Sequence, residues 1–69
     1  MESKQNNKLG IKIKTLRQKA GLSQDELARK SDVAYTTLTK IETGVIKSPS
    51  VFVVEKIAKA LGVPIENLL

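Results

Sequence analysis

A chain of 69 residues is long enough for one small domain, close to the size at which a single hydrophobic core is only marginally stabilising. The sequence contains no cysteine and no histidine, which excludes disulfides, thiol chemistry, the usual zinc sites and imidazole catalysis. Twelve Lys and Arg residues against seven Asp and Glu residues give a net charge of +5, which suits a polyanionic partner without identifying one.

Several function classes are disfavoured by what the sequence lacks. No apolar run approaches the roughly 20 residues needed to cross a bilayer, and the N-terminus lacks the apolar core of a signal peptide. Every long apolar stripe is used by the core, which leaves none for a membrane-surface helix. No nucleophile stands next to a base and the carboxylates are scattered, so we expect no enzyme activity, cofactor, metal or small-molecule substrate. These absences predict a cytoplasmic protein with no membrane partner.

The first seven residues, MESKQNN, are polar without apolar periodicity and predict a flexible N-terminal arm over residues 1–7. The remaining residues, 8–69, show no repeat, no low-complexity segment and no second domain. The first helix is expected over residues 8–20, where apolar side chains recur at steps of four, three and four: Leu9, Ile13, Leu16 and Ala20. Gly21 is placed to end this helix as a C-terminal cap.

Two short helices joined by a tight turn are predicted between residues 23 and 44. Ser23 and Glu26 have the spacing of a capping box, in which the Ser oxygen accepts from the amide of residue 26 and the carboxylate accepts from the amide of residue 23. Ser31 and Asp32 end the first helix, because Asp tolerates a left-handed backbone at modest cost.

The second of these helices is expected over about residues 35–43, with Leu38 and Ile41 buried and Gly44 as a left-handed C-terminal cap. Hydrogen-bonding or cationic side chains occupy its outward face: Tyr35, Thr36, Thr39 and Lys40. Threonines beside a tyrosine are an odd choice for a helix face under no other demand, because Thr is a poor helix former. This face therefore has two interpretations: it is a functional surface, or it is an ordinary solvent-exposed helix face without a specific role.

A loop separates this pair from a further helix, in which Ser48 is the expected N-cap and Pro49 a first-turn residue. Apolar residues cluster on one side of that helix: Val51, Val54, Ile57, Ala58 and Leu61. Phe52 points away from this cluster, either as a lone exposed aromatic or as a partner surface. Gly62 closes the helix, and Pro64 opens a last short turn, IENLL.

The string GLSQDELARKSDVAYTTLTKIETG resembles the helix-turn-helix of the phage repressor and Cro-like class, the XRE family. The pattern is carried by apolar positions, with a small residue where the two helices meet: Leu27, Ala28, Val33, Leu38 and Ile41. The resemblance covers residues 9–69 and implies an all-α, compact five-helix repressor-type bundle with a central helix-turn-helix. It also implies a bacterial or phage-type, nucleoid-associated protein that binds double-stranded DNA sequence-specifically to regulate transcription.

The resemblance assigns roles to individual residues. The second helix would lie in the major groove, whose width of about 12 Å admits one α-helix. Base contacts are then expected from Tyr35, Thr36, Thr39 and Lys40, although Tyr35 could instead reach only a phosphate oxygen. Phosphate contacts are expected from Gln24, Thr37, Thr43 and Lys47. The family also pairs the equivalents of Arg17 and Glu42, which implies a structural ion pair here.

Repressors of this class pair two-fold near the C-terminal end, so a weak homodimer that is strengthened on DNA is expected. Candidate contacts are Phe52, Pro64, Leu68 and Leu69, although the two leucines could instead cap the core. The same fold also serves protein-interaction modules such as antitoxins and adaptors, and this is the alternative function. That alternative predicts only weak DNA binding and a tight protein complex.

Two residues depart from the family pattern. Asp32 replaces the usual turn Gly, which introduces some backbone strain. Ala34 occupies the N-cap position of the second helix, where Ser or Thr is typical, and the loss of such a cap costs about 1 kcal/mol. The sequence therefore predicts that this helix is present, but it defines the first residue and the angle of the helix less well.

Overall fold

The computed structural model describes residues 7–69, which fold into four α-helices and one 3-10 turn. The elements in chain order are α2 (Lys8–Lys19), α3 (Gln24–Ser31), α4 (Tyr35–Thr43), α5 (Val51–Leu61) and η1 (Ile65–Asn67). The all-α class is confirmed, but the expected fifth helix is only the turn η1, whose hydrogen bonds run from each residue to the third before it. Residues 1–6 of the predicted arm lie outside the described residues.

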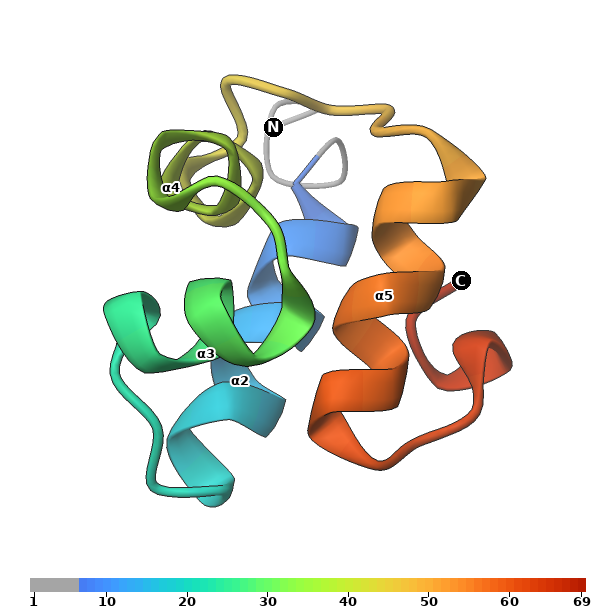
Figure 1. The fold of residues 1–69 in the computed structure, drawn as a ribbon. Coiled ribbons are helices and arrows are strands. Elements are labelled where there is room, and N and C mark those ends of the chain that lie inside the picture. The colour runs from blue at the N-terminus through green and yellow to red at the C-terminus, as the bar shows by residue number, and fades with distance from the viewer. Residues whose placement is uncertain (1–6) are drawn as a thin grey trace.

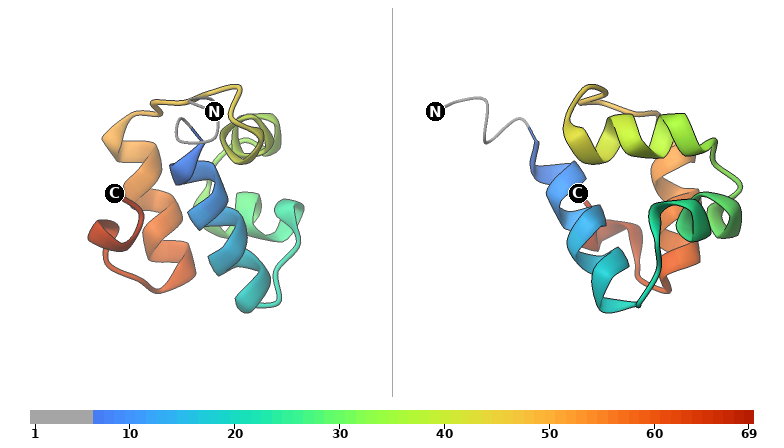
Figure 2. Two further views of the ribbon diagram at one scale, coloured as in Figure 1. Left: turned by 180° about the vertical axis from the view of Figure 1, so that it is seen from behind. Right: turned by 90° about the vertical axis from the view of Figure 1, so that its left-hand side faces the viewer.

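Helix α4 lies at one end of the molecule. Helix α3 packs against both α4 and α5, and α2 packs against α4 and α5. Figure 1 looks along the axis of α4, with α3 below it and α5 on the right. In the right-hand view of Figure 2, α4 lies across the top of the molecule, above α3. Within residues 7–69, no helix covers the outer side of α4.

The core lies where the helices meet. Its most deeply buried side chains come from all four helices and from the C-terminal turn: Ile13, Leu27, Leu38, Ile41, Ile57 and Leu68. Two residues assigned to buried stripes are exposed instead. Ala20 is the C-cap residue after α2, and Val51 is the first residue of α5 and is 58% exposed. Both stand at a helix terminus, where the element extends past its packing partners.

Helix α3 begins and ends through local interactions, as the sequence predicts. Ser23 Oγ accepts from the amide of Glu26 at 3.0 Å, and the Glu26 carboxylate accepts from the amide of Ser23 at 2.8 Å. The main-chain amide and the hydroxyl of Ser23 hold the pKa of the Glu26 carboxyl below its usual value. At the other end Asp32 is left-handed, with φ of 59°, and the amide of Val33 donates to the carbonyl of Ala28 at 3.0 Å.

Helix α5 starts later than predicted. Ser50, not Ser48, is the N-cap, because its backbone is extended and its Oγ accepts from the amide of Val53 at 3.2 Å. Pro49 therefore lies in the loop before the cap and not in the first turn. A serine flanks the proline on each side, so local residue preferences do not distinguish the two candidate caps.

Helix α4 starts without a side-chain cap. Ala34 holds the N-cap position with φ −59° and ψ 140°, an extended backbone that Ser also adopts. We expect Ala34→Ser to raise the free energy of unfolding by about 1 kcal/mol, because its hydroxyl would accept from a free amide of the first turn. Urea denaturation measures the gain, and the exposed Ala20→Ser should change stability by less than about 0.5 kcal/mol. A variant no more stable than the parent would contradict this view of the helix start.

A glycine inside α2 lets this helix touch the end of α4. A Cβ at Gly10 would collide with the main-chain oxygens of Ile41 and Glu42. The Asn7 side chain fills the neighbouring space against Gly44, and its Nδ2 donates to the Glu42 carbonyl at 3.5 Å. The C-terminal end of α4 is therefore held against the start of α2.

Candidate nucleic-acid interface

The side of α4 that faces away from the core carries polar side chains. Tyr35, Thr36 and Lys40 are exposed, and Thr39 is half-buried. The opposite side is buried: Leu38, Ile41 and Glu42. Residues four apart on a helix lie one above the other, so Thr36 and Lys40 share one face. The structure thus brings the four predicted base-contacting residues to the uncovered side of a single helix.

Two hydroxyls on α4 are already engaged within the helix. Thr39 Oγ1 donates to the carbonyl oxygen of Thr36 at 2.9 Å, and Thr43 Oγ1 donates to that of Thr39 at 2.9 Å. A hydroxyl carries one proton, so in this rotamer each can only accept a hydrogen bond from a ligand. Thr39 can therefore meet an amino group of a base, whereas Thr43 must rotate before it can donate to a phosphate.

Gln24, the first residue of α3, is bound to the end of α4. Its Nε2 donates to Glu42 Oε1 at 2.9 Å. The side-chain amide nitrogen carries two protons, so the second remains for an anion. The free main-chain amides and the dipole at this helix start favour negative charge at the same place. Glu42 therefore orients a residue that the sequence analysis assigned to a phosphate.

The other two predicted phosphate contacts differ in accessibility. Lys47 is exposed in the loop over residues 44–50, which follows α4. Its ammonium group has three donors on a flexible stem and can reach a phosphate without rearrangement of the backbone. Thr37 is half-buried on α4. Its side chain is short, so it can contact a phosphate only where that phosphate lies directly against α4.

A buried ion pair joins α2 to the end of α4. Arg17 Nε lies 2.8 Å from Glu42 Oε2, and Arg17 Nη2 donates to Glu42 Oε1 at 3.2 Å. The two side chains are only 9% and 2% exposed. Arg17 Nη1 also donates to the carbonyl of Leu22 at 2.8 Å, just before α3. The planar guanidinium makes two bonds to the carboxylate, and this bidentate geometry fixes the position of α4 relative to α2.

The Glu42 carboxylate links three helices, because it accepts from Arg17 on α2 and from Gln24 on α3. Sequence reasoning from the family missed the Gln24 bond and the Arg17 bond to Leu22. The partners are far apart in the chain, and no local spacing rule signals them. The Gly10 contact did have a signal, since a glycine inside a helix costs about 1 kcal/mol relative to Ala and points to close packing.

The predicted self-association residues do not form one exposed surface. Leu68 is 1% exposed and belongs to the core, so it is not a dimer contact. The reason is η1, which packs on α5 and turns the chain back onto the core. Pro64 is exposed, as are Phe52 and Leu69, which are 72% and 73% exposed on different elements.

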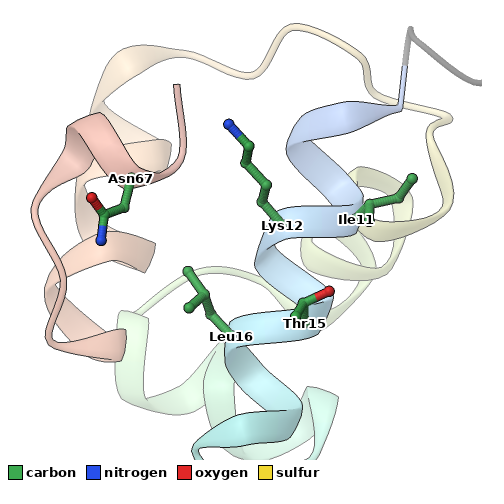
Figure 3. A pocket seen from close by; sticks show the side chains of 5 residues that line it. All are labelled: Ile11, Lys12, Thr15, Leu16 and Asn67. Atoms are coloured by element: carbon green, nitrogen blue, oxygen red, sulfur yellow. The ribbon is translucent and has the colours of Figure 1, made fainter.

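A groove of about 340 Å³ lies between α2 and the C-terminal segment (Figure 3). It is lined by Ile11, Lys12, Thr15, Leu16 and Asn67. Ile11 is 52% exposed, and Lys12 Nζ donates to the main-chain oxygen of Leu69 at 3.5 Å. With Leu68 buried, this groove is an accessible, largely apolar feature at the C-terminal end of residues 7–69.

Membrane-spanning helices and clusters of metal ligands are both absent from residues 7–69. No helix in this range is both long and apolar enough to cross a bilayer. No group of three or more Asp or Glu side chains in the same range converges as metal ligands would.

Known proteins resemble this chain along most of its length. Residues 13–68 match the helix-turn-helix family model. The HTH-type transcriptional regulators SinR of Bacillus subtilis (strain 168) and of Bacillus licheniformis are each 38% identical over 61 residues, which covers 88% of this chain and 55% of each relative. The chain thus spans about half the length of the curated relatives it matches.

A solved structure gives the same result for the fold. The crystal structure of SinR, the master regulator for biofilm formation, in complex with DNA matches with a TM-score of 0.85 and 37% identity. The match covers 87% of this chain and 95% of that one. Because the family match runs from α2 to η1 and the relatives agree with it, the chain belongs to the XRE-type helix-turn-helix family.

Proposed function

We propose that this chain binds double-stranded DNA sequence-specifically through α4 and thereby regulates transcription, in the cytoplasm at the nucleoid. The observation that carries the proposal is the likeness to the SinR–DNA complex, with 37% identity and a TM-score of 0.85. The structure of α4 supports this proposal, because its polar side is uncovered and its buried side is fixed to α2 by the Arg17–Glu42 ion pair. The helix-turn-helix family includes transcriptional regulators such as the two SinR proteins.

The base contacts follow from the groups on α4. In the major groove, α4 lies along the base edges while α3 crosses the backbone. Lys40 would donate to guanine O6 and N7, and the Thr36 methyl and hydroxyl would meet a thymine methyl or a base edge. Thr39 would accept from an amino group of adenine or cytosine, because its own proton is engaged.

Tyr35 is assigned to a base and not to a phosphate. It lines a hollow between α3 and α4 together with the carboxylates of Asp25 and Asp32. Asp25 is paired with Arg29, whose Nη2 lies 3.0 Å from Asp25 Oδ2. Arg29 lines the same hollow, so its lining carries two carboxylates against one guanidinium, and this net negative charge disfavours a phosphate beside Tyr35.

The phosphate contacts position the chain without reading sequence. Gln24 would offer its second Nε2 proton beside the free amides of α3. Lys47 would supply a full positive charge from the loop after α4. Thr37 and Thr43 would contribute weaker contacts, the latter after rotation of its hydroxyl.

We expect Lys47→Ala to weaken binding to all duplex sequences alike. Protein–DNA affinity falls log-linearly with salt, with a slope of about −0.9 per phosphate neutralised, so losing one contact should flatten the slope by about one unit. Fluorescence anisotropy over a salt series measures both effects. Lys19→Ala, exposed at the end of α2, is the control with the same loss of charge. An affinity that does not change with salt would overturn the proposed phosphate contacts.

We expect weak self-association in solution that strengthens on DNA, because operators for this class present two half-sites about one helical turn apart. The groove lined by Ile11 is one candidate surface, and Leu69 adjoins it because its main-chain oxygen accepts from the groove residue Lys12. Phe52 is the other candidate. Sedimentation with a selected duplex measures the stoichiometry. Ile11→Glu and Phe52→Ser then show which surface pairs. One protomer per duplex on a non-palindromic site would contradict the dimer.

Chemical-shift mapping of the labelled chain with a short duplex tests the interface as a whole. The expected result is that amide shifts concentrate at residues 24, 35–43 and 47. The protein-interaction alternative predicts small shifts on DNA and tight binding to a protein partner. Shifts centred on the C-terminal half of α5, with none on α4, would overturn the assignment of α4.

A further inference from the structure

A second charged feature lies between α3 and α5, away from α4. We name it the basic hollow, and its lining consists of Lys30, Ser31, Lys56, Lys59 and Ala60. Its volume is about 340 Å³, which is enough for one or two side chains. Lys30 lies in the last turn of α3, while Lys56 and Lys59 come from α5. Three lysines from two helices therefore line one concavity, and no Asp or Glu is among its lining residues.

Helix stability alone does not explain this arrangement. A lysine near a helix C-terminus is stabilised by the helix dipole, which accounts for Lys30 and Lys59 on their own helices. It does not account for Lys56 or for the convergence of all three. Like charges that share a concavity repel one another, and an anion placed between them removes that repulsion.

The chemistry of the lining favours carboxylates over phosphates. The Ser31 hydroxyl donates to the carbonyl of Leu27 at 2.7 Å, so it is not free to donate to an anion. Ammonium groups bind carboxylates and phosphates alike, so the donors alone do not decide between the two kinds of anion. Ala60 and the lysine methylenes supply an apolar wall that suits the methylenes of Asp and Glu.

We propose that the basic hollow docks an acidic segment of a protein partner. None of its lining residues belongs to α4, and Lys30 stands at the opposite end of α3 from Gln24. The hollow therefore stays accessible when α4 and the start of α3 are occupied by DNA. A partner bound there can join the chain on its operator without competing with the bases.

The test uses the full chain, isotopically labelled and saturated with duplex DNA. The probe is a fluorescent helical peptide with glutamates on consecutive turns of one face, and the control peptide has Gln in place of each Glu. We expect the Glu peptide to shift the amides of residues 30, 56 and 59 and the Gln peptide to shift none. The titration is repeated without DNA, which measures peptide binding to the basic hollow independently of DNA binding. A failure of peptide docking is thereby distinguished from a failure of DNA binding.

A matched pair of triple variants decides the location. Lys30→Gln with Lys56→Gln and Lys59→Gln should weaken peptide binding about tenfold or more. Lys8→Gln with Lys14→Gln and Lys19→Gln removes the same charge from exposed positions on α2 and should weaken it less than about threefold. Equal losses in the two triples, peptide shifts on α4, or displacement of the peptide by excess duplex would each overturn the proposal.

Discussion

Arg17→Ala should lower the free energy of unfolding by about 3–5 kcal/mol, because it strands the Glu42 carboxylate without its charge partner. The pair is buried, with side chains 9% and 2% exposed, so water cannot replace the guanidinium. The same substitution also frees the Leu22 carbonyl, which Arg17 Nη1 now satisfies at 2.8 Å. Urea denaturation of the parent and the variant measures the loss.

Two controls separate burial from charge. Arg29→Ala breaks the exposed pair with Asp25, whose side chains are 74% and 62% exposed, and should cost less than about 0.5 kcal/mol. Replacing Arg17 with Met and Glu42 with Leu together should cost much less than Arg17→Ala, since no charge is left stranded and only the hydrogen bonds to Leu22 and Gln24 are lost. If Arg17→Ala cost as little as Arg29→Ala, the pair would be an ordinary surface interaction.

Lys40→Ala should weaken binding to the preferred duplex by about 1–3 kcal/mol and relax the choice of base at one or two positions only. The reason is that Lys40 is the one cationic side chain among the four predicted base-contacting residues of α4. Anisotropy titrations against the preferred duplex and each single-base variant of it measure both effects. Lys14→Ala, exposed on α2, removes the same charge and should leave the base preferences intact.

The local parts of the fold could be predicted because short-range physics decides them. The capping box at Ser23 and the left-handed turn at Asp32 each depend on residues within one helical turn, and both are present in the structure. The buried stripe of α4, Leu38 and Ile41, follows from helical periodicity in the same way. The prediction of Ser48 as the N-cap is wrong, because Ser48 and Ser50 both flank Pro49 and only the register of α5 in the core distinguishes them.

The features that the sequence did not reveal depend on contacts between distant residues. The bond from Gln24 to Glu42 and the contact of Gly10 with the end of α4 exist only once three helices have packed. Leu68 was a candidate dimer contact, and its burial depends on how η1 folds back onto α5. The family resemblance predicts a phosphate contact for the Thr43 hydroxyl. In the structure that hydroxyl already donates its proton to the carbonyl of Thr39, which the sequence does not reveal.

Whether α4 reads the bases is tested most directly by selecting binding sites from a random duplex pool with the parent, Lys40→Ala and Thr36→Ala in parallel. Exposed side chains one turn apart on α4 reach neighbouring base pairs, so each variant should lose preference at a different position. The expected result is one enriched consensus for the parent and a consensus relaxed at one or two base pairs for each variant. The same consensus from all three proteins, or no enrichment with the parent, would contradict recognition through this helix.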